Sequence, residues 1–133
     1  MRISKSERAV IWSLFVFAII VNIAGYVWDL YDQFWWFDEA LHLYTSFALT
    51  LALALRLYSR GLASVRDATL VLALTVASVG IAVGTLWEVG EWGYDQFVPT
   101  DVILGKTDTI VDLMLDTAGA AAAALVILGM VKR

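Results

Sequence analysis

Residues 108–131 read DTIVDLMLDTAGAAAAALVILGMV, an apolar run long enough to cross a membrane that begins with regularly spaced acidic residues. Asp108, Asp112 and Asp116 follow one another at steps of four, so on a helix their carboxylates share one face. A charged side chain at the centre of a spanning helix costs about 2.5 to 3.5 kcal/mol on insertion scales, and such groups usually face the protein interior. The stretch therefore predicts a membrane helix whose acidic face packs against other helices.

The composition of the whole chain is that of an integral membrane protein. Of its 133 residues 61% are hydrophobic and 17% are charged, and the mean hydropathy is +0.78. The net charge of -4 provides no basic surface for nucleic acid phosphates, which excludes nucleic acid as a partner. The chain contains no cysteine, so disulfides, thiolate nucleophiles and thiolate metal ligands are excluded as well.

Four apolar stretches approach the roughly 20 residues that cross a hydrocarbon core. They are residues 9–27, 40–57, 68–87 and 110–131. This pattern predicts an all-α, polytopic membrane protein in which residues 1–133 form a single domain of four transmembrane helices.

The basic residues predict the orientation of this domain. Eight of the nine lie before the first stretch, at the end of the second or between the second and third, or after the fourth: Arg2, Lys5, Arg8, Arg56, Arg60, Arg66, Lys132 and Arg133. Because positive residues collect on the cytoplasmic side, we expect both termini to be cytoplasmic. The other two connections hold nine carboxylates and Lys106, and they should face outward.

Polar residues at helical spacing also occur around the second and third stretches. Asp38 and His42, the single histidine, are four residues apart, and Thr45 continues the same stripe. The third stretch ends in a second stripe, formed by Glu88, Glu91 and Asp95. With the aspartates of the fourth stretch, three helices thus present acidic faces near one membrane boundary.

Small residues on the predicted helices allow these acidic faces to meet. Gly80 and Gly84 are four residues apart, and Gly119 lies in an alanine-rich tract, both of which let membrane helices approach closely. We therefore predict an outward-opening pocket with six metal ligands: Asp38, His42, Glu88, Glu91, Asp112 and Asp116. Thr45, Asp95 and Asp108 are expected to lie around this set as second-layer residues.

A divalent cation is the economical partner for so many carboxylates in a poorly hydrated space, because repulsion and desolvation oppose their charged forms. Oxygen ligands suit Mg²⁺, Ca²⁺ or Mn²⁺, while the imidazole also allows Zn²⁺ or Fe²⁺. Several of these residues alone also have a structural interpretation, whereas Asp112 and Asp116 do not, because an aspartate pair inside a span is rare and normally faces the protein interior. Asp108 can stabilise a helix N-terminus, His42 can be a hydrogen-bonded core residue, and Asp38 with His42 can form a plain ion pair.

The combined motifs resemble a known family. They are Asp38-Glu39-Ala40-Leu41-His42, Trp87-Glu88-Val89-Gly90-Glu91-Trp92 with Asp95, and Asp108, Asp112, Asp116 and Gly119. Within residues 25–125 they resemble the small bacterial and archaeal inner-membrane proteins of the YjdF-like group and, more distantly, the VanZ-like proteins. Glu39 and Asp116 depart from the VanZ-like pattern, which has lysine and asparagine there.

The resemblance implies a compact helical fold with a polar site, as a multi-pass protein of the prokaryotic cytoplasmic (inner) membrane. VanZ-like proteins are linked to glycopeptide resistance, which suggests an envelope lipid or glycolipid as the molecule acted on. An enzyme would use the metal to polarise a phosphoryl or ester group while a carboxylate or His42 moves a proton. The alternatives are a non-catalytic accessory or structural subunit, as a homo-oligomer or in a larger membrane complex, and a cation or proton transporter.

Overall fold

The computed structural model describes residues 4–58, 69–99 and 102–131. Its helices are α1 (Lys5–Val27), α2 (Leu30–Gln33), α3 (Phe37–Tyr58), α4 (Thr69–Asp95) and α5 (Lys106–Val131). No strand occurs in these ranges, which confirms the all-α fold class. All except α2 are long and apolar enough to cross a membrane, as the sequence predicted.

The helices extend beyond the apolar stretches at the end of the bundle that holds α2. There α3 begins at Phe37, α4 continues to Asp95 and α5 begins at Lys106. A helix satisfies its own backbone hydrogen bonds whether its side chains are polar or apolar, so hydropathy marks the membrane-embedded part better than the helix ends. The acidic residues of the predicted pocket are consequently held on regular helices and not in loops.

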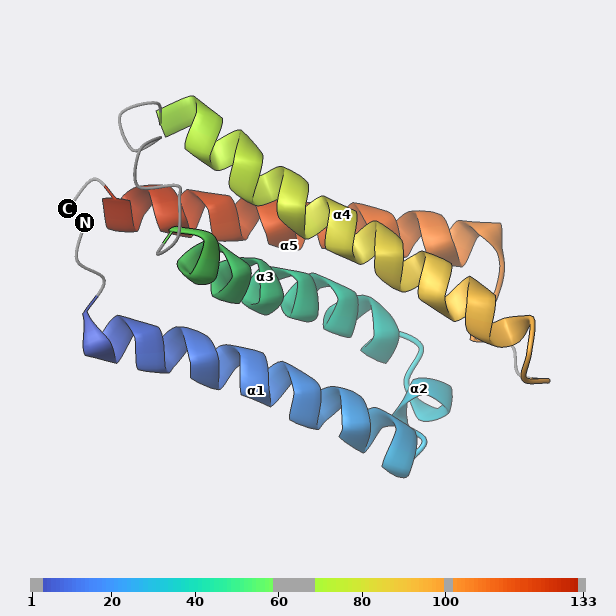
Figure 1. The fold of residues 1–133 in the computed structure, drawn as a ribbon. Helices are drawn as coiled ribbons and strands as arrows, with labels where there is room; N and C mark the ends of the chain where they lie inside the picture. The colour runs from blue at the N-terminus through green and yellow to red at the C-terminus, as the bar shows by residue number, and fades with distance from the viewer. Residues whose placement is uncertain (1–3, 59–68, 100–101, 132–133) are drawn as a thin grey trace.

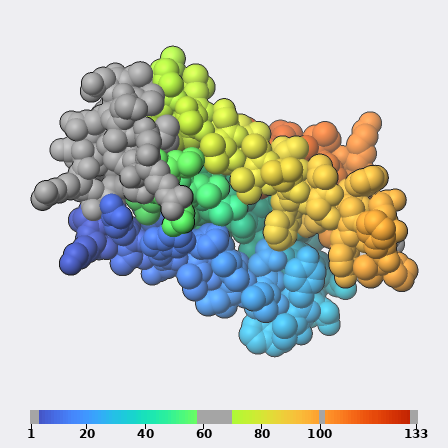
Figure 2. Space-filling view, viewed as in Figure 1, coloured from blue at the N-terminus to red at the C-terminus, as the bar shows by residue number. Residues whose placement is uncertain are grey.

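The four long helices run side by side, with the start of α1 and the end of α5 at the same end of the bundle (Figure 1). The most extensive packing joins α5 to α3 and to α4, whereas α1 packs against α3 and α2. Between the described parts of α1 and α4 there is no close backbone approach. The space-filling view shows a hollow between these two helices, with α3 at its floor (Figure 2).

Glycines determine how closely the central helices pack. A Cβ atom built on Gly119 would lie 2.5 Å from the Leu43 carbonyl oxygen and 2.9 Å from the Phe47 nitrogen, both on the backbone of α3. A Cβ on Gly80 would lie 2.6 Å from Cβ of Ala120, so α4 and α5 also meet at a small residue. These two contacts bring α3, α4 and α5 to backbone distance beside the acidic residues.

The end of the bundle away from α2 is filled by apolar side chains. All four long helices contribute to this core: Ile11, Leu51, Ala52, Ala54, Leu55, Leu72, Val76, Ala123, Ala124 and Ile127. Leu72 and Val76 are almost completely buried. Close packing of apolar side chains therefore dominates this half of the bundle.

A short aromatic turn joins α1 to α3. Asp29 has φ = 52°, a left-handed conformation that Asp tolerates better than most residues, and it begins α2. Tyr31 then packs edge-on against Phe37, with ring centroids 5.1 Å apart. Gly25 leaves room for this pair, because a Cβ there would lie 2.5 Å from the Tyr31 ring. The turn places Tyr31 at the wall of a cavity that Asp38, His42 and Asp116 also line.

Candidate metal centre

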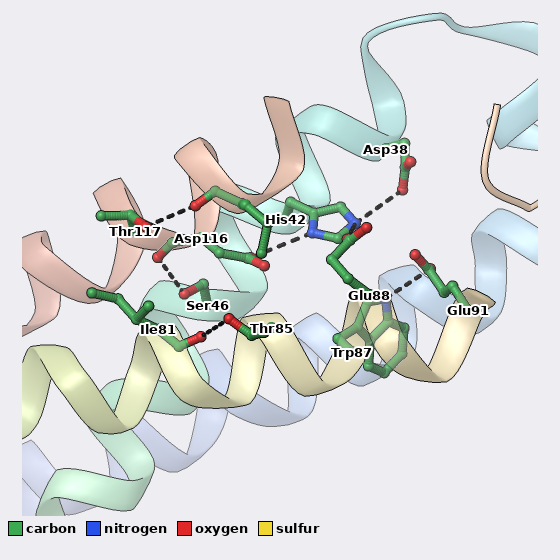
Figure 3. A network of polar contacts seen from close by, with 11 residues as sticks. Asp38, His42, Ser46, Ile81, Thr85, Trp87, Glu88, Glu91, Asp116 and Thr117 are labelled. Carbon is green, nitrogen blue, oxygen red and sulfur yellow. Dashed lines mark hydrogen bonds and ion pairs between the residues drawn. The ribbon is translucent and has the colours of Figure 1, made fainter. Parts of the chain in front are cut away.

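His42 is the centre of the predicted cluster. Its Nε2 atom lies 3.7 Å from Asp38 Oδ1 and 3.7 Å from Glu88 Oε1, and its Nδ1 atom lies 3.4 Å from Asp116 Oδ1. The close-up shows the imidazole between Asp116 on one side and Asp38 and Glu88 on the other (Figure 3). One side chain of α3 thus contacts acids from α3, α4 and α5.

Two overlapping groups in the described residues have the geometry of a metal site. One consists of Asp38, His42 and Asp112, and the other of His42, Glu88 and Asp116. Within each group one potential ligand atom from every residue lies within 4.8 Å of the others. The helical spacing of Asp112 and Asp116 places both on the buried face of α5, as the four-residue step predicted.

Gly84 and Ser46 fix the position of Asp116. A Cβ on Gly84 would lie 2.7 Å from both Cβ and Cγ of Asp116, so α4 leaves space for this side chain only because residue 84 is glycine. On the opposite side, Ser46 Oγ donates a buried hydrogen bond of 2.7 Å to the Asp116 backbone carbonyl. Asp116 is therefore clamped between α3 and α4.

Several oxygens of the cluster are buried and accept no hydrogen bond from the described residues. They are both carboxylate oxygens of Glu88 and Oδ2 of Asp116. Glu88 is 5% exposed and Asp116 is 4% exposed, so more than nine-tenths of each residue is buried. Buried polar groups normally have partners, and an orphaned charged oxygen costs more than a neutral one. These oxygens therefore need a positively charged or hydrogen-donating ligand.

The imidazole cannot meet this need by itself. A neutral imidazole has one N–H donor and one lone pair, yet both nitrogens of His42 face carboxylate oxygens. A doubly protonated ring would donate from both nitrogens but would bring one positive charge to four carboxylates, those of Asp38, Glu88, Asp112 and Asp116. Further positive charge or bound protons must balance the remainder.

A small inner cavity of about 40 Å³ borders the cluster. Its wall includes Asp38, His42 and Asp116, so each of the two groups contributes two residues to it, whereas Glu88 and Asp112 do not line it. A water molecule needs roughly 10 to 15 Å³ of such volume. The inner cavity therefore has room for an ion with one or two waters and is too small for a lipid headgroup.

The remaining predicted ligand, Glu91, lies outside both groups. Its Oε1 atom accepts a hydrogen bond of 2.8 Å from Trp87 Nε1 on the preceding turn of α4. Its side chain still lines the inner cavity. The structure thus brings five of the six predicted ligands together and places the sixth at the edge of the cavity.

Of the three residues expected around the cluster, only Thr45 lines the inner cavity. Asp95 accepts hydrogen bonds of 3.0 Å from the backbone nitrogens of Val102 and Ile103, and Asp108 accepts one of 2.9 Å from the Leu104 nitrogen. These two aspartates therefore shape the connection between α4 and α5. For Asp108 this agrees with the structural alternative that its position at the start of a helix suggested.

Four other polar residues belong to the pocket and were not predicted from the sequence. Asn22, Tyr31, Ser46 and Thr50 line the inner cavity together with the acids. Burial raises the pKa of Tyr31, which keeps its hydroxyl protonated as a donor. Ser46 and Thr50 lie four and eight residues after His42, so the same helical periodicity could have identified them, whereas isolated residues such as Asn22 carry no such signal.

Comparisons with known proteins agree with this architecture. A family model with the description "Predicted membrane protein (DUF2238)" matches residues 3–133. An "Uncharacterized protein" of Thermotoga maritima is 31% identical over 101 residues, which cover 74% of this chain and 50% of the relative. The chain thus spans about half the length of that relative. No solved structure matches the chain significantly. The family match is consistent with the YjdF-like resemblance, while the VanZ-like resemblance receives no support from it.

Proposed function

The chain belongs to the DUF2238 family of predicted membrane proteins, and we propose that it binds a divalent cation through Asp38, His42, Glu88, Asp112 and Asp116 and uses it to hold the headgroup of an envelope lipid or glycolipid. The single observation that supports the cation is the set of orphaned oxygens on Glu88 and Asp116. A divalent ion between these oxygens would satisfy them and offset the charge of the cluster.

The ligand chemistry is that of a hard cation. Four carboxylates and one imidazole suit Mg²⁺, Mn²⁺ or Ca²⁺, and the imidazole also makes Zn²⁺ acceptable. The inner cavity leaves space for one or two water ligands beside the protein groups. A lipid oxygen could replace such a water at the edge of the cavity.

The position of the pocket favours a ligand that arrives from the membrane. The inner cavity is bounded by Asn22 on α1 and by Gly84 and Trp87 on α4, two helices that do not pack against each other in the described ranges. The hollow between them is visible from the side of the bundle (Figure 2). Lipids border spanning helices at this position, so a lipid reaches the pocket without leaving the bilayer.

Elemental analysis of the purified full chain, before and after dialysis against a chelator, tests the cation. We expect about one divalent ion per chain, lost with the chelator and restored by adding the ion back. The double variant Glu88→Gln, Asp116→Asn should fold and lose the ion, because two ligands of one group lose their charge. The matched double variant Asp32→Asn, Glu39→Gln removes two charges outside both groups and should retain it. An unchanged ion content in the first variant would refute the proposal.

A second candidate is a structural ion in a non-catalytic subunit. The clamp on Asp116 favours it, because Ser46 and Gly84 already join three helices at this residue. In that case ion removal would leave lipid binding unchanged, whereas under the first proposal it would weaken lipid binding; the unfolding temperature should fall in both cases. Measuring lipid binding on the chelated sample therefore separates the two candidates.

A further inference from the structure

A larger cavity lies next to the inner one at the α2 end of the bundle. It has a volume of about 390 Å³, and we name it the aromatic vestibule after its lining residues: Tyr26, Leu86, Trp87, Gly90, Glu91, Tyr94 and Val102. Its size is within the roughly 300 to 1,000 Å³ typical of small-molecule sites. Trp87 and Glu91 line both cavities, so the aromatic vestibule borders the metal centre directly.

The lining of the aromatic vestibule has a definite chemistry. Three aromatic rings, those of Tyr26, Trp87 and Tyr94, share this space with a single carboxylate, that of Glu91. Aromatic faces attract cations, and a carboxylate adds charge and hydrogen-bond acceptors. Tyrosine and tryptophan also form belts at membrane surfaces. A belt requires neither a cavity nor an acid among the rings, so belt formation does not explain the vestibule.

The Glu91 carboxylate is held in position for such a ligand. Trp87 Nε1 donates to its Oε1 at 2.8 Å, which fixes the side chain at the boundary between the two cavities (Figure 3). A carboxylate can accept several hydrogen bonds, so this contact leaves acceptor capacity for a further donor. The two metal-ligand groups do not include Glu91, so its charge is not committed to the cation proposed there.

We infer that the aromatic vestibule binds the primary ammonium group of an ethanolamine-type phospholipid, whose N–H groups donate to Glu91 while the rings of Trp87 and Tyr94 surround the charge. The inference rests on the proposed cation site only for the other end of the headgroup. The phosphate lies two carbons from the ammonium group and would face the inner cavity. The vestibule lies beside the last turns of α4, at and beyond the end of the apolar stretch, which is the level at which a bilayer would hold its headgroups.

Titration of the purified full chain in detergent with short-chain phospholipids of identical acyl composition tests this inference. We expect phosphatidylethanolamine to bind about tenfold more tightly than phosphatidylglycerol, as the charge and cation–π terms together suggest. Phosphatidylcholine, whose quaternary ammonium group carries a positive charge but has no N–H donor, should lie between them. Equal affinity for the ethanolamine and glycerol lipids would overturn the inference.

Variants then assign the preference to the vestibule. Glu91→Gln should abolish the preference for ethanolamine over glycerol lipid and retain the divalent ion. The matched variant Asp32→Asn removes an exposed carboxylate on α2 and should keep both properties. A Glu91→Gln protein that keeps its preference, or that loses its ion, would overturn the inference. Free ethanolamine that binds as tightly as the lipid would also do so. The ion content of Glu88→Gln, Asp116→Asn tests only the proposed cation site. The lipid preference of the unaltered chain, and its loss in Glu91→Gln, test this inference separately.

Discussion

The two halves of the bundle solve the problem of helix packing in a membrane differently. At the end where α1 begins, branched and small apolar residues such as Leu51, Leu72 and Ile127 fill the interior. At the α2 end the same helices approach through glycine and surround His42 with acids. In lipid, close packing needs no polar groups, so the first half is sufficient for a stable bundle. The acidic half therefore adds the free-energy cost of buried carboxylates, and a function for these groups is the natural explanation.

The same comparison bears on transport. The inner cavity extends as far as Thr50 and Gly80. The apolar core lies beyond these residues on the same helices. Among the described residues no polar stripe continues through that core. The arrangement is that of a pocket with one closed end, which favours binding over passage of an ion.

The largest expected change in unfolding free energy comes from a substitution in the apolar half. Leu51→Ala should lower the free energy of unfolding by about 2 to 5 kcal/mol, because Leu51 is 2% exposed and its removal leaves a cavity. The content of divalent ion in the folded fraction should be unchanged. Denaturant titration in mixed micelles measures the stability, with Leu125→Ala on the exposed surface as control. A selective loss of the ion would contradict the separation of the two halves.

Removal of the cation should lower the stability of the protein through contacts in the acidic half. A ligand at 100 times its dissociation constant stabilises a folded protein by about 2.7 kcal/mol, so chelation should lower the unfolding free energy by a similar amount. The stabilisation should also fall as the pH is lowered, because protons compete with the metal for carboxylates and imidazole. In the Glu88→Gln, Asp116→Asn variant neither chelator nor added ion should shift the unfolding temperature.

Glycine substitutions test how the acidic half is assembled. Gly119→Ala should cost about 1 to 3 kcal/mol and weaken cation binding, because the new methyl group would meet the backbone of α3, which cannot move alone. Gly90→Ala is the matched control, since nothing lies within 4 Å of its Cβ position. Circular dichroism melts and metal titration measure both effects. Equal behaviour of the two variants would show that close approach at Gly119 is unnecessary.

The smallest effect is expected for the connection between α4 and α5. Asp95→Ala should lower the unfolding free energy by about 1 kcal/mol through loss of its hydrogen bonds to Val102 and Ile103. Cation affinity should stay within twofold of the original, since Asp95 belongs to neither ligand group. Isothermal titration with the metal checks this expectation. A large loss of affinity would indicate that Asp95 takes part in cation binding.

Periodicity predicted much of the site because a helix converts sequence spacing into direction. The steps from Asp38 to His42 and from Asp112 to Asp116 predict shared faces, and the structure buries His42, Asp112 and Asp116, while Asp38 is partly exposed beside them. The same rule could not separate Glu88 from Glu91, which are close in angle on α4. Their different surroundings depend on the rotation of α4 and on the Trp87 indole. That rotation is set by contacts at Gly80 and Gly84 with other helices.

The sequence also predicted four spanning helices but not the short helix α2 or the use of Tyr31. Hydropathy detects membrane segments because lipid imposes one length and one polarity on them. A four-residue helix after a left-handed Asp29 has no comparable signal. Orientation across the membrane stays a prediction from the distribution of basic residues.

The order of the helices along the chain has a consequence for biosynthesis. Asp112 and Asp116 belong to α5, which follows the other described helices and packs against both α3 and α4. A nascent chain that has inserted only the earlier segments lacks these two carboxylates and cannot assemble either ligand group. If the chain binds the proposed cation, ion capture would require that α5 has been inserted, and a product truncated before α5 would remain unloaded.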